Sequence, residues 1–298
     1  MNQKIKIAQV GVGRWGKKLL QEFLVQADII CVCHRGSVES TDFLKENYPT
    51  MRITTSLNDI LRDNSIEAVV VVTPINTHFE IAKRVLQSGK HLFLEKPGGQ
   101  NRQELGILVN EAKKRNLVLM IGYVFTYNPV LTKIKELLRN EKIKSLHFEW
   151  FKWGSFDEHI IPNLFPHDIS IMLLLGIFPN NIEYYREYQF ISNADILEIG
   201  LKNNEVVVHS YINRISTEKR KTLIINTNKN TYIWNNRELC KIDAKERERV
   251  QIEVDSLSTP VAIEIRDFLH SIKNNIEPKS NGEFGLKVFE VLEQIDYR

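Results

Sequence analysis

The first 122 residues alternate between short apolar runs and helical patterns. The apolar runs are rich in Val and Ile and nearly continuous, which is typical of parallel strands covered on both faces. They lie at Ile5–Val10, Ile29–Cys33, Ala68–Val72, His91–Leu94 and Val118–Ile121. Helical patterns separate them at Arg14–Gln26, Asn76–Ser88 and Asn101–Arg115. This βαβ order predicts a doubly wound α/β domain.

The pattern changes after Gly122. An amphipathic helix is predicted at Asn128–Asn140, and segments rich in β-forming residues follow it. These segments are Ile143–Trp153, Ile182–Phe190, Ile196–Leu201, Val206–Arg214, Thr222–Asn226 and Thr231–Trp234. Further helices are expected near Pro166–Gly176, at Pro260–Asn275 and at Phe284–Asp296. The sequence therefore predicts one domain at residues 1–122 and a second at 123–298. The second would be an α+β domain with an open, mostly antiparallel sheet.

Composition narrows the class of protein. The chain has 298 residues and a formal net charge of only +3, and its densest charged stretch, Asp243–Arg249, mixes both signs as a solvated turn does. Partners such as nucleic acid or a membrane are therefore not expected. The three cysteines, Cys31, Cys33 and Cys240, argue against disulfides and a metal site and for a reducing compartment. No apolar stretch reaches the length of a membrane span, so we expect a cytoplasmic protein.

A glycine motif follows the first predicted strand and opens the first helix. It reads Gly11-Val12-Gly13-Arg14-Trp15-Gly16. Gly11 would allow the tight turn, Gly13 the approach of a pyrophosphate, and Gly16 the close packing of helix on strand. The helix N-terminus would add free N–H groups and its dipole. The motif and its strand–turn–helix setting predict a Rossmann domain that binds a dinucleotide.

The end of the second strand bears on the choice of cofactor. An acidic residue that binds the adenosine ribose is usual there, and His34 stands in its place. The next residue, Arg35, would attract a 2′-phosphate, which favours NADP(H) over NAD(H). Alternatively, Arg35 stacks on the adenine or faces water.

Two other strand ends carry candidate chemistry at the same sheet edge. Thr73 and Pro74 end one strand and precede His78, which is either a titrating group or a polar histidine on a helix surface. The sequence Glu95-Lys96-Pro97 ends the next strand. Lys96 would point toward the nicotinamide and act as acid or base on a hydroxyl or carbonyl; alternatively, it is a surface lysine paired with Glu95.

The predicted helix near Pro166 carries the remaining candidates. Asn163 and His167 are four residues apart, so they share a face if both are helical. His167 can exchange protons near neutral pH. Alternatively, Asn163 caps the helix and His167 is simply hydrogen-bonded.

Together these motifs resemble the glucose–fructose oxidoreductase/inositol dehydrogenase/rhizopine catabolism family, Gfo/Idh/MocA. The order is GxGxxG, TPxxxH, EKP and then a helical histidine. The resemblance implies that Lys96 and His167 lie at the catalytic centre. It also implies an open sheet that forms a homodimer or homotetramer, for which the aromatic run Phe148, Trp150, Phe151 and Trp153 would be suited.

Finer features resemble the branch that acts on nucleotide-linked sugars. They are Trp15-Gly16-Lys17, Gly122-Tyr123, Tyr127-Asn128-Pro129 and Pro166-His167-Asp168-Ile169-Ser170. The substrate residues implied by the resemblance are Lys96, Tyr123, Tyr127, Asn163 and His167. One position departs from the family, because Asn163 stands where aspartate is usual. Asparagine keeps the hydrogen bonding but cannot accept a proton.

The expected function is hydride transfer between a nicotinamide cofactor and a secondary hydroxyl or ketone of a sugar or nucleotide sugar. In this hypothesis Lys96 is the acid/base, and His167 binds the reacting oxygen or shares its proton, oriented by Asn163. Two alternatives stay open. One is a cofactor-binding sensor or regulator of the same fold, and the other is a reductase with a non-sugar substrate.

Overall fold

The computed structural model describes residues 4–236, 238–254 and 257–295. These residues divide into two units, 1–124 with 258–289, and 125–257 with 290–298. Residues 258–289 group with the N-terminal strands, whereas the sequence pattern predicts that they belong to a second domain at 123–298. They do so because Ile121 N donates a hydrogen bond to Ser280 O at 2.8 Å and Met120 forms a β-bridge with Asn281.

The first unit is built on a parallel sheet of six strands in the order β3-β2-β1-β4-β5-β6. The strands are β1 (Lys6–Val10), β2 (Asp28–Cys33), β3 (Arg52–Thr54), β4 (Ala68–Val71), β5 (His91–Glu95) and β6 (Leu119–Gly122). The helices are α1 (Arg14–Gln26), α2 (Val38–Asn47), α3 (Leu57–Leu61), α4 (His78–Gln87), α5 (Arg102–Lys114), α8 (Pro260–Asn274) and α9 (Gly282–Leu292), with the 3₁₀ turn η1 (Ile75–Thr77). This strand order is that of the Rossmann fold, which confirms the prediction.

Burial explains why the apolar runs could be recognised. All four residues of β4 are buried, and so are most residues of β1 and β5. The elements of this unit that were not predicted, α2, β3 and α3, are short or largely exposed: β3 has three residues, two of them polar. They bury too few apolar positions to leave a periodic pattern.

The second unit contains a sheet in the order β14-β13-β12-β11-β7-β10-β9-β8. Its strands are β7 (Ile143–Trp153), β8 (Asn181–Tyr188), β9 (Ile196–Asn203), β10 (Val206–Asn213), β11 (Ile215–Thr227), β12 (Asn230–Asn235), β13 (Glu238–Asp243) and β14 (Arg249–Ile252). Among the described strands, β7 and β10 pair in parallel and the other neighbours are antiparallel. The predicted open, mostly antiparallel sheet is confirmed.

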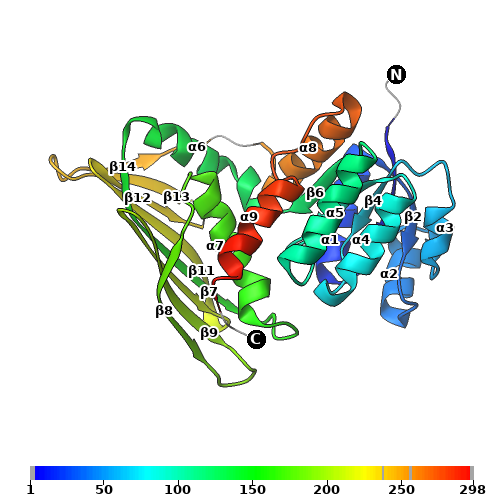
Figure 1. The fold of residues 1–298 in the computed structure, drawn as a ribbon, viewed down its shortest axis with the longest axis horizontal. Helices are drawn as coiled ribbons and strands as arrows, with labels where there is room; N and C mark the ends of the chain where they lie inside the picture. Colours follow the sequence, from blue (N-terminus) through cyan, green and yellow to red (C-terminus); the bar gives the residue numbers. More distant parts are fainter. Residues whose placement is uncertain (1–3, 237, 255–256, 296–298) are drawn as a thin grey trace. The chain divides into compact units, whose positions relative to one another are not determined.

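Helices α6 (Pro129–Leu137) and α7 (Ile160–Leu174) complete this unit, with the 3₁₀ turns η2 (Val124–Tyr127) at its start and η3 (Leu138–Asn140) after α6. Helix α7 packs on β9 and β10 and covers one face of the sheet (Figure 1). The closing helices were predicted at nearly their observed positions; Asp296, the last residue predicted in α9, lies outside the described residues. No helix in the described part of the chain is both long and apolar enough to cross a membrane.

The two faces of this sheet differ in exposure. Along β7, Phe148 and Trp150 belong to the face under α7, and Phe148 is buried. Phe151 and Trp153 belong to the opposite face, where Trp153 is 59% exposed. The expectation that all four aromatic residues line one exposed surface was therefore wrong, because side chains alternate along a strand.

Candidate active site

The glycine turn between β1 and α1 depends on two close approaches. Gly11 has φ +104°, and a Cβ on it would lie 2.4 Å from the carbonyl oxygen of Val72. A Cβ on Gly16 would lie 2.7 Å from the Gly11 carbonyl oxygen. Gly13 differs, because a Cβ there would have no heavy atom within 4 Å. Gly11 and Gly16 are therefore needed for close packing, whereas Gly13 leaves open space in front of the helix.

The start of α1 suits an anion. Gly13 is its N-cap, with no side-chain cap and no acidic residue in the first turn. Val12 is buried, whereas Gly13 and Arg14 are exposed. A helix start that exposes amides without a side-chain acceptor attracts phosphate. These residues therefore fit the pyrophosphate of a dinucleotide.

The turn after β2 holds His34 and exposes Arg35. The His34 ring is 7% exposed, its Nδ1 accepts a hydrogen bond from Gly36 N at 3.1 Å, and Thr41 Oγ1 lies 3.5 Å from its Nε2. Burial lowers the pKa of His34. His34 therefore shapes the turn, and Arg35 is the side chain in this pair that faces solvent.

His78 holds the turn after β4. It is 1% exposed, and its Nε2 lies 2.7 Å from the carbonyl oxygen of Thr73. Burial lowers the pKa of His78 to about 4, although the hydrogen bond to Thr73 opposes the shift. The ring is therefore neutral at pH 7 and donates its N–H to the carbonyl. Because His78 is buried, the alternative of a polar histidine on a helix surface was wrong. At the same strand end, Thr73 is half-buried and Pro74 is exposed.

The end of β5 is joined to the glycine motif. Trp15 Nε1 donates a hydrogen bond to Glu95 Oε1 at 2.6 Å, and Lys96 N donates to Glu95 Oε2 at 3.2 Å. A Cβ on Gly122 of β6 would lie 2.9 Å from Glu95 Oε1, so a glycine there leaves room for the carboxylate. Burial raises the pKa of Glu95 to about 7, while the hydrogen bond from Trp15 and the charge of Lys96 oppose the shift. Lys96 itself is half-buried.

Tyr123 supports the turn that contains Lys96. Its side chain is fully buried, its hydroxyl donates a hydrogen bond to Pro97 O at 3.3 Å, and its ring packs edge-on against Phe284 at 5.5 Å. Its ring fills the core of the first unit, and its role in substrate binding, which the resemblance implies, stays a prediction. Tyr127, in the second unit, is also buried, with 5% of its surface exposed.

Helix α7 begins earlier than predicted. Its N-cap is His159, whose Nδ1 accepts a hydrogen bond from Ile161 N at 3.4 Å, and Pro166 lies inside the helix. The alternative that Asn163 caps the helix was therefore wrong. Asn163 and His167 are both helical and half-buried, so their spacing of four places them on one face.

Aromatic rings surround His167. Its ring centroid lies 5.1 Å from that of Phe125 and 5.0 Å from that of Trp150. One turn further on, Ser170 Oγ donates a hydrogen bond to the His167 carbonyl oxygen at 2.7 Å. An imidazole fixed in this way can bind a hydroxyl or exchange a proton with it.

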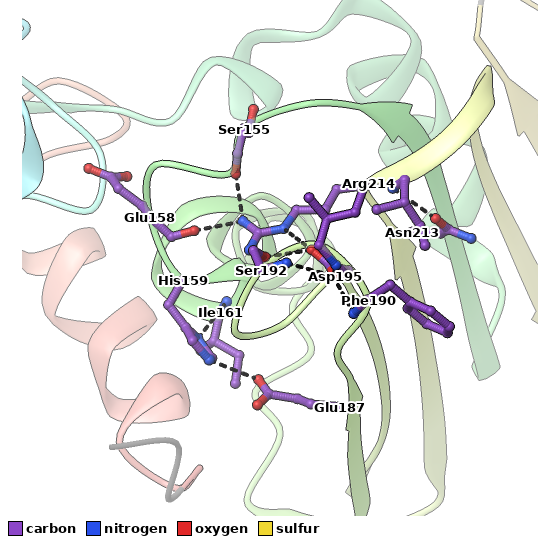
Figure 2. Close-up of polar contacts among 12 residues, drawn as sticks. Ser155, Glu158, His159, Ile161, Glu187, Phe190, Ser192, Asp195, Asn213 and Arg214 are labelled. Atoms are coloured by element: carbon purple, nitrogen blue, oxygen red, sulfur yellow. Dashed lines mark hydrogen bonds and ion pairs between the residues drawn. The ribbon is translucent and has the colours of Figure 1, made fainter.

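Arg214, which follows β10, fixes the segment that leads into α7 (Figure 2). Its side chain is 1% exposed, and Nη1 donates hydrogen bonds to the carbonyl oxygens of Ser155 at 2.5 Å and Glu158 at 2.6 Å. Nη2 donates to Ser192 Oγ at 2.6 Å, and Nε lies 3.7 Å from Asp195 Oδ1. This group could not be predicted from the sequence, because an isolated arginine at a strand end is usually solvated.

Asp195 completes this network. Its Oδ2 accepts hydrogen bonds from the backbone N–H groups of Phe190, Ile191 and Ser192 at 2.7, 2.5 and 3.0 Å. Burial alone raises its pKa, but the hydrogen bonds outweigh burial and lower the pKa of Asp195 to about 2. His159, the cap of α7, lies 3.3 Å from Glu187 Oε1. The start of α7 is thus tied to the β8–β9 loop, as Figure 2 shows.

A Rossmann unit with a lysine at a strand end, followed by a mostly antiparallel sheet whose helix carries a histidine, is the arrangement of an oxidoreductase with two units. Residues 5–123 match the model of the oxidoreductase family with an NAD-binding Rossmann fold, GFO_IDH_MocA. Over these residues the chain is similar to this family of oxidoreductases.

Two relatives are similar to this chain in sequence, and a solved structure shares its fold. The UDP-N-acetylglucosamine 3-dehydrogenase of Acidithiobacillus ferrooxidans is 26% identical over 225 residues, 72% of this chain and 69% of that protein. The myo-inositol 2-dehydrogenase of Thermotoga maritima is 26% identical over 146 residues, 48% of this chain and 43% of that protein. A crystal structure of the Acidithiobacillus enzyme superposes with a TM-score of 0.89 at 23% identity, covering 99% of this chain and 97% of that one.

Proposed function

We propose that the protein transfers a hydride between a nicotinamide cofactor and a secondary hydroxyl or ketone of a sugar or nucleotide sugar. One observation carries the proposal: Trp15 of the glycine motif is hydrogen-bonded at 2.6 Å to Glu95, which directly precedes Lys96. The turn suited to the cofactor phosphates and the candidate acid/base are therefore held together within one unit.

The bound cofactor would supply the hydride acceptor or donor. Lys96 would take the proton from the hydroxyl during oxidation and return it during reduction. Gly11, Gly13 and Gly16 would hold the pyrophosphate, with Thr73 and Pro74 contributing at the β4 end. In the second unit, His167 would bind the sugar oxygen, and Asn163 on the same helix face would orient the sugar by hydrogen bonds.

The names of two relatives favour a polyhydroxylated ring as substrate, since one acts on UDP-N-acetylglucosamine and one on myo-inositol. A direct test is to incubate the protein with NAD⁺ or NADP⁺ and each of UDP-N-acetylglucosamine, UDP-glucose and myo-inositol. The expected result is reduced nicotinamide with at least one of them, and none with Lys96→Met. Reduction by the variant at the wild-type rate would contradict the role of Lys96.

Asn163 supports a second candidate, a cofactor-binding sensor of the same fold, because the position lacks the aspartate usual in the family. Asn163→Asp distinguishes the two. If asparagine reflects lost catalysis, the variant gains turnover. If asparagine is adapted to the substrate, turnover falls or the pH optimum moves while cofactor affinity stays unchanged.

We also propose that the protein is a homodimer or homotetramer assembled through the second sheet. The support is the sheet face opposite α7, which carries Phe151 and the largely exposed Trp153. Light scattering at micromolar concentration should give at least twice the mass of one chain, and a clean monomer mass would contradict the proposal.

A further inference from the structure

A buried lysine lies under α7 in the second unit. Lys221 on β11 pairs in register with Trp150 on β7, and only 8% of its surface is exposed. Its Nζ lies 3.8 Å from the ring centroid of Phe125 and 3.8 Å from that of Trp150. The same Nζ lies 3.4 Å from Asp168 Oδ1. The ammonium group is therefore placed against two aromatic rings and one carboxylate.

These contacts offset the free-energy cost of burying the charges of Lys221 and Asp168. Asp168 is fully buried, and its Oδ2 accepts a hydrogen bond from Ser210 Oγ at 2.7 Å. Burial lowers the pKa of Lys221 to about 8, while the charge and hydrogen bond of Asp168 oppose the shift. Burial raises the pKa of Asp168 in turn, and the charge of Lys221 opposes that shift, so each group stabilises the charged form of the other. Apolar side chains at these two positions would often give the same or greater stability than the buried ion pair. Stability alone therefore does not account for a lysine at position 221.

The groups that Lys221 contacts are also those that surround His167. Phe125 and Trp150 both pack against the imidazole, at 5.1 and 5.0 Å between ring centroids. Asp168 is the residue that follows His167 on α7. Lys221 thus contacts both rings that flank the imidazole and the neighbouring residue on its helix.

We infer that Lys221 is a positioning residue for His167, which it acts on through the Phe125–Trp150 ring pair and Asp168. The inference rests on the proposed function, in which His167 binds the sugar. The ammonium attracts the faces of both rings, and it attracts the carboxylate of α7 from the strand below. Because the ammonium holds both rings and the carboxylate of Asp168, the ring pair is fixed against α7 and the His167 imidazole keeps one orientation.

The same strand offers a matched control. Arg220 precedes Lys221 and belongs to the opposite sheet face, since side chains alternate along a strand. Its guanidinium lies 4.4 Å from the Phe151 ring centroid, and its Nη2 lies 3.5 Å from Glu149 Oε2. Arg220→Met therefore removes a cation, a ring contact and an ion pair from the same strand without touching the surroundings of His167.

The first measurement needs no turnover. The imidazole resonances of His167, assigned by their loss in His167→Ala, are compared by NMR in the wild type, Lys221→Met and Arg220→Met. The expected result is a shift or broadening in Lys221→Met, recovery toward wild type in Lys221→Arg, and no change in Arg220→Met. Because Lys221→Met leaves Asp168 without its cation, Lys221→Met/Asp168→Asn is measured as well. A His167 spectrum that is unchanged in Lys221→Met and in Lys221→Met/Asp168→Asn would overturn the inference.

The second measurement uses the sugar that the wild type turns over. Lys221→Met should lower kcat by about tenfold or more with little change in KM or cofactor affinity, and should add no further loss in the His167→Ala background. Losses that multiply in the double variant would show that Lys221 acts independently of His167 and would overturn the inference. If the wild type oxidises no sugar, the proposed function fails, while the NMR result still decides whether Lys221 positions His167.

Discussion

In the first unit the buried acidic groups near the candidate cofactor turn are Glu95 on β5 and Glu264 on α8, whereas in the second unit Asp168 and Asp195 each face a buried cation. Glu264 is 0% exposed, and neither carboxylate oxygen has a hydrogen-bond partner among the described residues. Burial, with the nearby charge of Glu95, raises the pKa of Glu264 well above its usual value. In contrast, hydrogen bonds hold the pKa of Asp195 at about 2.

This difference shows how each unit accommodates a buried carboxyl group. A carboxyl that lacks a cation avoids the cost of a buried charge by keeping its proton. A carboxylate that accepts several hydrogen bonds, as Asp195 does, stays charged and fixes the loops around it. The first unit therefore holds buried carboxyl groups whose pKa is raised, whereas the second unit pairs buried carboxyl groups with cations near the start of α7 and beside His167.

The largest expected effect is on stability when a buried pair of the second unit is broken. Arg214→Met leaves Asp195 buried without its cation and removes the bonds to Ser155, Glu158 and Ser192. Breaking a buried pair costs about 3–5 kcal/mol. Urea unfolding measures this loss. Arg220→Met, which removes a more exposed pair from the same sheet, should cost about 0–1 kcal/mol. Equal losses in the two variants would contradict the importance given to the Arg214 network.

The second effect concerns pH and should appear in the first unit. Because the pKa of Glu264 is raised on folding, the folded state keeps a proton that the unfolded state loses above about pH 4.3. Stability should therefore fall as pH rises from there through the folded pKa, by up to about 1.4 kcal/mol per pH unit. Glu264→Gln should remove this part of the slope, while Glu283→Gln on the exposed side of α9 should not.

The opposite direction is expected for Asp195. Its lowered pKa stabilises the fold above the unfolded pKa of about 3.9, and this contribution is lost as pH falls toward 2. Thermal melts of the Glu264→Gln variant should thus show a smaller decline above about pH 4.3, where Glu95 still contributes, and an unchanged decline as pH falls toward 2. If Glu264→Gln leaves the decline above pH 5 unchanged, the protonated state of Glu264 is disproved.

The smallest expected effect concerns the choice of cofactor. Arg35 is exposed, whereas the neighbouring His34 is buried, so the Arg35 guanidinium is accessible to a 2′-phosphate. The wild type should bind NADPH more tightly than NADH, and Arg35→Asp should weaken NADPH binding by roughly tenfold, or about 1.4 kcal/mol. Fluorescence titration measures both constants, with Arg62→Asp as an exposed control in the same unit. Equal or tighter binding of NADH by the wild type would refute the preference.

The sequence predicted best those features that depend on local pattern. The parallel strands, the glycine turn and the helical spacing of Asn163 and His167 follow from periodicity and from the conformational needs of Gly11. The start of α7 was predicted too late because Pro166 suggests a first turn, whereas the hydrogen bond from Ile161 N to His159 begins the helix earlier.

The pairs that depend on tertiary contacts could not be predicted. Lys221 and Asp168 are 53 residues apart, and Arg214 and Ser155 are 59 apart. Lys221 and Arg214 are charged residues in β-rich segments, and the sequence pattern predicts that such residues face solvent. Tyr123 shows the converse, because a tyrosine at a strand end looks available to substrate until Phe284 of α9 is seen to pack on it.

The central claim is that Lys96 transfers the proton during hydride transfer. The most direct measurement is the single-turnover rate of nicotinamide reduction for the wild type and Lys96→Met, with cofactor affinity measured on the same samples. A general acid/base contributes about 10²–10⁴-fold, so the account predicts a rate loss of that size with nearly unchanged affinity for the cofactor. A variant that reduces the cofactor at a near-wild-type rate on the same sugar would contradict the claim and leave Lys96 with a structural role.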